Sequence, residues 1–534
     1  MARARFIPTP FSLLTAVVVS LAGAGALGQE TGNSGRLAQT KEEQLGSTPT
    51  GFTPVVLYQD GLKALYSSQK RAEPALRCDL LLEGGLRFDK SFLGEVRSSP
   101  DHRHMAFAVG TVESRFRQAT WNVVYDGKAL DFHADEIKSL TFSTDSSQLA
   151  FAVRRGAEWQ ICTPDKPGNP TYERVSAPVF GSGSLHLAYG ASRSGQQLFI
   201  LDGQTVFSAD ESHCAPSDSL DFFPAFSPDG KSWAIAVSNC KRGWSYRVNG
   251  KMEAASYMVL GPFVFSPDGQ HTAYGAATFK SGFVAGRALG TVVVDGKESG
   301  HYEVQALGNA QGTVKIGPKK RLQPSFASVS SPEYSLDGRH LVYIGQLGLG
   351  RAMVVVDGQP GAEFAQIIDE PVLSPDGQHM GYLAMRNREL VQVLDGRVTG
   401  LGDLVPEKSF SFAGLARISP DGKHFGCVIT KSGVLFTAGM ERARRRLLLD
   451  GKLEKEYDCM EMSPPLFSSD GRHHACVVRG VKELDGKSLV VVDGFEGPLY
   501  DSIPPGVPPR LEGAAVTFVG LRDGVRYRVT EQAP

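Results

Sequence analysis

The stretch Phe226-Ser227-Pro228-Asp229-Gly230 is followed, 39 residues later, by Phe265-Ser266-Pro267-Asp268-Gly269. The same block recurs from Leu373 to Gly377 and from Ile418 to Gly422, and looser copies begin at Phe142, Tyr334 and Phe467 and near Ser99. Ser-Pro-Asp-Gly is typical of a turn, because proline presets φ and glycine accepts a positive φ. Its regular return indicates an architecture of repeated units.

A second block follows each copy of the first and consists of an apolar run that ends in Asp-Gly or Asn-Gly. Clear examples end at Gly296, Gly358 and Gly494, and others end at Gly127, Gly203, Gly250, Gly396 and Gly451. Asp-Gly between alternating apolar residues is a strong hairpin signal. Each repeat is therefore predicted to contain strand a, the Ser-Pro-Asp-Gly turn, strand b, a loop, strand c, the Asp-Gly turn and strand d.

The spacing of the repeats selects the fold. Aligned serines lie 39 residues apart from Ser335 to Ser374, then 45 and 49 residues apart to Ser419 and Ser468. Four short strands in about 40–45 residues are typical of a β-propeller blade. We predict an all-β fold, a β-propeller of four-stranded antiparallel blades with about ten repeats over residues 51–534. The 69-residue interval from Ser266 to Ser335 predicts an insertion at 300–333. The alternative is two propellers with their seam there.

These blocks resemble the WD-type β-propeller repeats of the TolB-like kind, which occur in many exported bacterial proteins. The resemblance covers nearly all of residues 55–530 and implies the propeller fold. It implies little about function, because one fold carries many activities. Residues 29–50 are too few for the N-terminal domain on which the role of TolB itself depends, so the resemblance is to the repeat and not to that protein.

The N-terminus predicts export. Arg3 and Arg5 precede an uncharged, mostly apolar run from Phe11 to Gly28, and small residues end it. This is the pattern of a secretory signal peptide, so residues 1–28 are predicted to be removed and 29–50 to form a flexible leader. The alternative is an uncleaved anchor. The mature chain is expected in the periplasm or outside the cell, with no membrane span after cleavage.

Composition excludes some classes of partner and site. Lys+Arg number 56 and Asp+Glu 57, so the net charge of −1 argues against general nucleic-acid binding. The seven cysteines include no Cys-x-x-Cys pair, so neither a dense disulfide framework nor a zinc ribbon is indicated. Cys427 and Cys476 share a repeat position and are expected in the core, and Cys214 with Cys240 is considered as a disulfide.

Several repeated residues suggest sites but have simpler interpretations. Seven histidines occupy one repeat position: His104, His186, His271, His340, His379, His424 and His473. Copies in neighbouring blades are about 10 Å apart, too far for one metal ion, so we interpret them as structural. Trp121, Trp159 and Trp244 are expected to pack in the core or at blade edges. The basic runs 315–321 and 442–446 are interpreted as solvated loops.

No catalytic motif is recognised, and no cofactor, metal or catalytic residue is predicted. The leading hypothesis is a non-enzymatic scaffold that binds a protein, peptide or glycan through loops of variable length, which antiparallel topology places on one face. Its candidate contacts are Arg115, Phe116, Arg242, Phe279, Lys280, Lys319, Lys320 and Arg321. The alternative is a propeller lyase, lactonase or glycosidase with its site in the central channel, where a cluster of non-repeat Asp, Glu or His would favour the enzyme.

Overall fold

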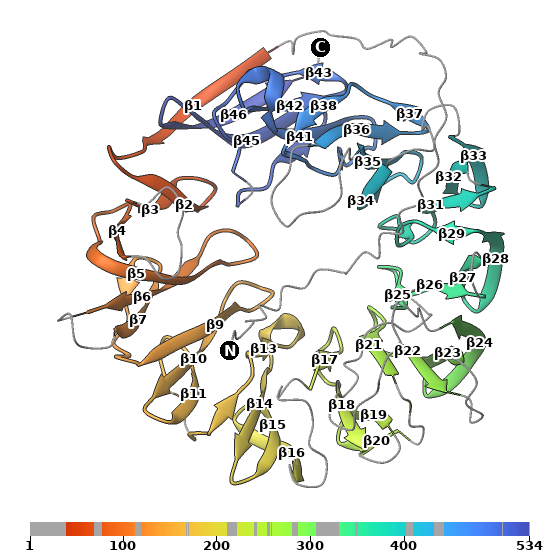
Figure 1. The fold of residues 1–534 in the computed structure, drawn as a ribbon, viewed down its shortest axis with the longest axis horizontal. Helices are drawn as coiled ribbons and strands as arrows, with labels where there is room; N and C mark the ends of the chain where they lie inside the picture. Colours follow the sequence, from red (N-terminus) through yellow and green to blue (C-terminus); the bar gives the residue numbers. More distant parts are fainter. Residues whose placement is uncertain are drawn as a thin grey trace, which may run out of the picture.

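The structure is a computed structural model. It describes residues 39–68, 77–112, 119–166, 168, 170–210, 222–239, 243–253, 257, 259–279, 287–305, 331–347, 351–387, 389–401, 410–431, 443–504 and 506–532. Within these ranges the chain forms ten antiparallel sheets, which follow one another in chain order around a single ring (Figure 1). The chain is an all-β propeller, as predicted.

The first sheet has seven strands and holds two repeats. Its strands are β2 (Thr53–Tyr58), β3 (Lys63–Ser67), β4 (Arg77–Leu82), β5 (Arg87–Ser98), β6 (Met105–Thr111), β7 (Thr120–Tyr125) and β8 (Lys128–Ala129). The twelve-residue β5 pairs with β4 through its first half and with β6 through its second half. One strand is therefore the outer strand of repeat 1 and the inner strand of repeat 2.

The next four repeats follow along the ring. Repeat 3 has β9 (Glu136–Phe142), β10 (Leu149–Arg155) and β11 (Glu158–Cys162). Repeat 4 has β12 (Arg174–Val175), β13 (Val179–Phe180), the 3-10 turn η1 (Ser182–Ser184), β14 (Leu187–Arg193), β15 (Gln196–Leu201) and β16 (Gln204–Asp210). Repeat 5 has β17 (Ala225–Phe226), β18 (Trp233–Asn239), β19 (Gly243–Val248) and β20 (Lys251–Met252). Repeat 6 has β21 (Val259–Phe265), β22 (Thr272–Phe279), β23 (Arg287–Val294) and β24 (Lys297–Gln305).

Four more repeats lead to the C-terminal part of the chain. Repeat 7 has β25 (Glu333–Tyr334), β26 (Leu341–Gln346), β27 (Ala352–Val356) and β28 (Gln359–Phe364). Repeat 8 has β29 (Gln366–Ile367), β30 (Val372–Leu373), β31 (Met380–Arg386), β32 (Glu389–Leu394) and β33 (Arg397–Gly400). Repeat 9 has β34 (Phe410–Ile418), β35 (Phe425–Lys431), β36 (Ala443–Leu449), β37 (Lys452–Leu453) and β38 (Tyr457–Cys459). Repeat 10 has β39 (Glu461–Met462), β40 (Leu466–Phe467), β41 (His474–Val481), η2 (Lys482–Leu484), β42 (Lys487–Val492) and β43 (Phe495–Glu496).

The last sheet joins the two ends of the described chain. It is ordered β1 (Gln39–Ser47), β46 (Val525–Gln532), β45 (Ala515–Arg522) and β44 (Arg510–Glu512), and we call it the closing repeat. The expectation of a flexible leader is wrong for residues 39–47, because their backbone pairs with β46 from Gln39 opposite Gln532 to Ser47 opposite Val525. Residues 1–38, with the predicted signal peptide, lie outside the described ranges, as do 306–330 at the centre of the expected insertion.

The predicted turns have the predicted backbone. At the Asp-Gly turns the first residue has φ of 47–52° and the glycine φ of 74–82°. Two successive positive φ values define the type I′ hairpin turn, whose twist matches that of its strands. Asparagine and aspartate tolerate this conformation and glycine has no Cβ to clash, which explains why these residues recur.

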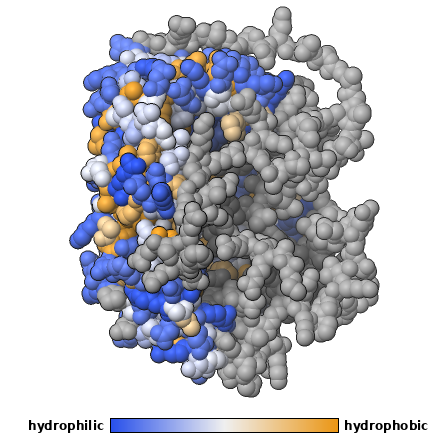
Figure 2. Space-filling view, turned by 60° about the vertical axis from the view of Figure 1, so that its left-hand side comes forward, coloured by the Kyte–Doolittle hydropathy of each residue, from blue (hydrophilic) through white to orange (hydrophobic). Residues whose placement is uncertain are grey.

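The core lies between neighbouring sheets. Strand b is buried along most of its length, as in β10, where the predicted alternation of large and small residues places Ala150 and Ala152 against repeat 4 and Phe151 against repeat 2. Figure 2 brings the side with β2–β11 forward and shows hydrophilic residues over its whole height, with hydrophobic residues between them in small groups. Among the described residues, no helix is long and apolar enough to cross a membrane.

Candidate functional site

The antiparallel strand order gives the ring two different faces. The a–b and c–d turns lie on one face, which we call the turn face, and the b–c loops and d–a crossings lie on the other, the loop face. Figure 1 places inner strands such as β17, β21 and β25 toward the centre and outer strands such as β16, β20 and β28 at the rim. Candidate sites are therefore the turn face, the inner strands and the loop face.

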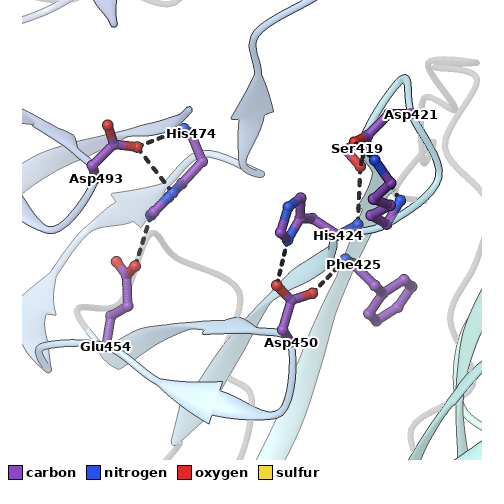
Figure 3. A network of polar contacts seen from close by, with 9 residues as sticks. Ser419, Asp421, His424, Phe425, Asp450, Glu454, His474 and Asp493 are labelled. Atoms are coloured by element: carbon purple, nitrogen blue, oxygen red, sulfur yellow. Dashed lines mark hydrogen bonds and ion pairs between the residues drawn. The ribbon is translucent and has the colours of Figure 1, made fainter. Parts of the chain in front are cut away.

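On the turn face, four side chains connect the two turns of a repeat, and we call them the turn clasp. In repeat 9 the Ser419 hydroxyl donates to Asp421 at 2.6 Å and accepts the backbone N–H of His424 at 2.9 Å. The ring of His424 contacts the carboxylate of Asp450 through Nδ1 at 2.6 Å (Figure 3). Asp450 accepts the backbone N–H of Phe425 with its other oxygen at 2.9 Å. The clasp joins the first hairpin of the repeat to the second.

All seven repeat histidines make this contact. The Nδ1 atoms lie 2.6–2.9 Å from an aspartate oxygen in the pairs His104–Asp126, His186–Asp202, His271–Asp295, His340–Asp357, His379–Asp395, His424–Asp450 and His473–Asp493. Each imidazole is thus oriented by its own repeat. Within the described ranges, no group of three or more His, Cys, Asp or Glu residues is placed to hold a metal ion. The structural interpretation of the histidines stays a prediction, and the contact of each ring with an aspartate of its own repeat supports it.

The contacts within the clasps also change the pKa of some of their side chains. The hydrogen bond from Ser419, with the backbone N–H of Lys423 and the Lys423 charge, lowers the pKa of Asp421 to about 2. The Asp202 carboxylate raises the pKa of His186, and Asp295 does the same for His271. Hydrogen bonds to the ionised form favour it, so Asp421 stays charged at neutral pH.

Repeat 10 adds a second, more buried histidine. His474 Nε2 lies 2.7 Å from Glu454 and Nδ1 lies 3.2 Å from Asp493 (Figure 3). The other oxygen of Asp493 contacts His473 Nδ1. Burial alone would lower the pKa of His474, but the contacts with Asp493 and Glu454 outweigh it and raise this pKa to about 9. The imidazolium is therefore enclosed between two carboxylates from repeats 9 and 10.

A second set of polar contacts joins neighbouring repeats at their outer strands. Tyrosine hydroxyls donate to a glutamate of the next repeat in Tyr257–Glu298, Tyr457–Glu496 and Tyr500–Glu42, at 2.9, 2.7 and 2.8 Å. The sequence analysis missed these contacts. Tyr457 and Tyr500 each follow the Asp of an Asp-Gly turn by seven residues, and Glu298 and Glu496 follow such an Asp by three. That constant offset was the available signal.

The inner strands of repeats 7 and 8 carry three carboxyl groups that are not part of the repeat pattern. Glu333 lies in β25, and Asp369 and Glu370 lie between β29 and β30. Glu333 and Glu370 are exposed and Asp369 is half-buried. Partial removal from water raises the pKa of all three, the Glu370 charge adds to this effect on Glu333, and the Asp369 charge adds to it on Glu370. A carboxyl group with a raised pKa is suited to act as a general acid.

Most residues chosen from sequence as loop-face contacts cannot be placed. Arg115, Phe116, Arg242, Lys280, Lys319, Lys320 and Arg321 lie outside the described ranges. Phe279 is the last residue of β22, where its backbone pairs with Ala288. The strand ends beside these segments do lie on the loop face, because β6–β7, β18–β19 and β22–β23 are b–c hairpins.

The remaining sequence expectations have mixed outcomes. The interpretation of 442–446 as a loop is wrong for Arg444, Arg445 and Arg446, which lie in β36. Arg445 donates to the carbonyl of Cys459 and Arg446 to that of Glu454 at 2.7 Å. These two guanidinium groups therefore form hydrogen bonds within repeat 9. Run 315–321 is outside the described ranges, as are Cys214 and Cys240.

The tryptophans and core cysteines are packed as expected. Trp159 is buried, and Trp121 and Trp244 are partly buried against core clusters. Each of the three forms a β-bridge with a residue beyond strand d, such as Trp121 with Ala134. Cys427 and Cys476 are buried and free.

Comparisons with known proteins agree with the fold and go no further. Neither a protein-family model nor a curated protein matches the sequence. The Dos1 propeller is similar at 10% identity, covering 64% of this chain and 91% of that one with a TM-score of 0.31. The β-propeller domain of the trilobed protease from Pyrococcus furiosus is similar at 13% identity, over 61% of this chain and 98% of that one with a TM-score of 0.28. TolB from Acinetobacter baumannii is similar at 14% identity, over 58% and 77% with a TM-score of 0.22. These values carry no argument about function, so the TolB-like relation stays a prediction.

Proposed function

We propose that this chain is an exported, non-enzymatic β-propeller scaffold that binds a protein, peptide or glycan partner through its loop face. The observation that supports the proposal is that the two faces differ: repeated side chains bind one another on the turn face, and connections of variable length lie on the loop face. On the turn face, the repeated Ser, Asp and His side chains bind one another within the clasps. The loop face carries the connections whose length differs from repeat to repeat, and such connections on a rigid scaffold are where binding residues usually lie.

Charge reversal on the two faces tests this proposal. On the loop face, Arg386 ends β31 and Lys482 lies in η2, and both are exposed. On the turn face, Lys231 and Lys423 follow Ser-Pro-Asp-Gly turns, with 84% and 75% of their side chains exposed. The partner would first be captured from the exported fraction with the tagged full chain, identified by mass spectrometry and purified. Its dissociation constant would then be measured against both double variants.

We expect Arg386→Glu with Lys482→Glu to weaken binding by about tenfold, which is about 1.4 kcal/mol. The matched pair Lys231→Glu with Lys423→Glu should leave the dissociation constant within about twofold, because these residues lie on the other face. A larger loss from the turn-face pair would contradict the proposal.

A second candidate, a propeller lyase, lactonase or glycosidase, is supported by the three carboxyl groups on the inner strands. Glycosidases need one carboxyl that is protonated at working pH and one that is ionised. The raised pKa of Glu333 and Glu370 suits the first role. The test is a screen for glycan and lactone cleavage with the wild type and with Glu333→Gln and Glu370→Gln. Activity lost in either variant would favour this candidate, and no activity in any of the three proteins would reject it.

A further inference from the structure

Among the described residues, the pairing of β1 with β46 closes the ring. Ion pairs support this closure. Glu42 in β1 accepts two hydrogen bonds from Arg522 at the end of β45, and Glu43 accepts one from Arg528 at 3.0 Å. Tyr500, which follows β43 of repeat 10, donates to Glu42 at 2.8 Å. The N-terminal strand is thus held to both the closing repeat and repeat 10.

One carboxyl group in this region has no such partner. Glu531 lies in β46 opposite Thr40 of β1 and Val516 of β45, and its side chain is 0% exposed. Neither of its carboxyl oxygens has a hydrogen-bond partner among the described residues. The carboxyl lies against the backbone of Gly497 in repeat 10. Both of its oxygens are so close that a Cβ added to this glycine would collide with them.

The surroundings of Glu531 disfavour its charge. Glu42 from β1 and Tyr500 from repeat 10 interact electrostatically with it, and Arg522 from β45 contacts Glu42. Arg522 pairs with Glu42, and Tyr500 also donates to Glu42, so neither compensates Glu531. Burial and the nearby Glu42 charge raise the pKa of Glu531 to about 8. An ionised carboxylate without a partner is costly to bury, so the group is neutral when the ring is closed at neutral pH.

We propose that Glu531 makes the closure of the ring sensitive to pH: β1 is held while this carboxyl is protonated and is released more easily when it is ionised. When β1 separates from β46, one side of Glu531 becomes accessible to water and its pKa falls toward that of a free glutamate, near 4.5. Opening then releases a proton. Between the two pKa values the closed ring binds more protons than the open one, so closure weakens as pH rises and stops weakening above about 8.

Hydrogen exchange of the full chain, read by mass spectrometry on peptides that cover 39–47, measures this opening. After correction for the intrinsic exchange rate, protection of β1 in the wild type should fall by about tenfold per pH unit between about pH 5.5 and 7, and less steeply toward pH 8. Glu531→Gln has the same shape and no charge to titrate. It should remove the pH dependence.

The matched control is Glu43→Gln. Glu43 of β1 is exposed and pairs with Arg528, which lies opposite it on β46, so the variant should lower protection by a constant factor and keep the slope with pH. A slope retained in Glu531→Gln, or no slope in the wild type, would overturn the proposal. Peptides from β18, on the opposite side of the ring from the closure (Figure 1), report whether the whole ring is affected instead.

Discussion

Repeat 9 carries His424 and Asp450 at the two positions where repeat 5 carries Ser232 and Asn249. In repeat 5 the Asn249 oxygen accepts the backbone N–H of Trp233 at 2.8 Å, and its amide donates to the Ser232 hydroxyl at 3.1 Å. The backbone is nearly the same, with φ of 47° at Asn249 and 48° at Asp450. The comparison teaches that the hydrogen bond between the turn residue and the first N–H of strand b is the constant feature, whereas the contact between imidazole and carboxylate is an addition.

The largest loss of stability is expected in repeat 10, where His474 adds a second imidazole to the clasp. His474→Leu leaves Glu454 and Asp493 facing each other without the imidazolium, and loss of one member of a buried charge set costs about 3–5 kcal/mol. The free energy of unfolding from urea titration measures it. His473→Leu is the control and should cost less, since this ring is more exposed than His474. Equal losses would contradict the account.

The same residue predicts a pH dependence. The pKa of His474 in the folded chain is about 9, above its ordinary value of 6.5. A raised histidine pKa stabilises the fold fully below about 6.5, and the contribution is lost as pH rises through 9. Urea midpoints of the wild type should therefore fall between pH 7 and 9 more steeply than those of His474→Leu. Parallel curves would show that His474 is not the group that titrates.

The second largest loss of stability is expected when the hydrogen bond from the turn residue to the first N–H of strand b is removed. Asp450→Ala leaves the N–H of buried Phe425 without its acceptor and places alanine at positive φ, which together cost about 2–3 kcal/mol. Asn249→Ala removes the corresponding acceptor in repeat 5 but no imidazole contact. It should cost about 1 kcal/mol less. Both values come from urea unfolding at the same pH, and the reverse order would be inconsistent with a stronger clasp in repeat 9.

Exchange of the two versions sharpens the comparison. Asp450→Asn keeps an oxygen for the Phe425 N–H and a residue that tolerates positive φ, and it removes only the charge on the His424 contact. The expected loss is about 0.5–1.5 kcal/mol. Thermal unfolding of the wild type, Asp450→Asn and Asp450→Ala measures the contribution of the charge separately from that of the hydrogen bond. If Asp450→Asn loses as much stability as Asp450→Ala, the charge is the main contribution.

The smallest expected effect is a gain. Ser232→His with Asn249→Asp converts repeat 5 to the version found in repeat 9, and the new contact should add about 0.5–1 kcal/mol. A double-mutant cycle isolates the coupling between the two positions. If the double variant is no more stable than the sum of the single ones, the imidazole contact contributes nothing in this repeat.

The sequence analysis predicted the fold because its evidence is local. Asp-Gly turns need two positive φ values in succession, and few residues allow them, so composition alone located the hairpins. The distance between copies of the turn, one per blade, excluded a shared metal at the histidines and left a structural role. The twelve-residue β5 escaped prediction because nothing in its residues indicates that one strand serves two repeats.

What the sequence alone determined, then, is the repeat: four strands, two turns and the residues of the clasp, all of which lie within about 45 residues of one another. Contacts between segments far apart in the chain were decided only by the tertiary structure. Glu42 meets Arg522 across 480 residues, and Glu531 is buried where β46 lies between β1 and β45 and its carboxyl lies against Gly497 of repeat 10. A charged residue reads the same in a sequence whether it is solvated or enclosed, and only the closed ring removes this carboxyl from water.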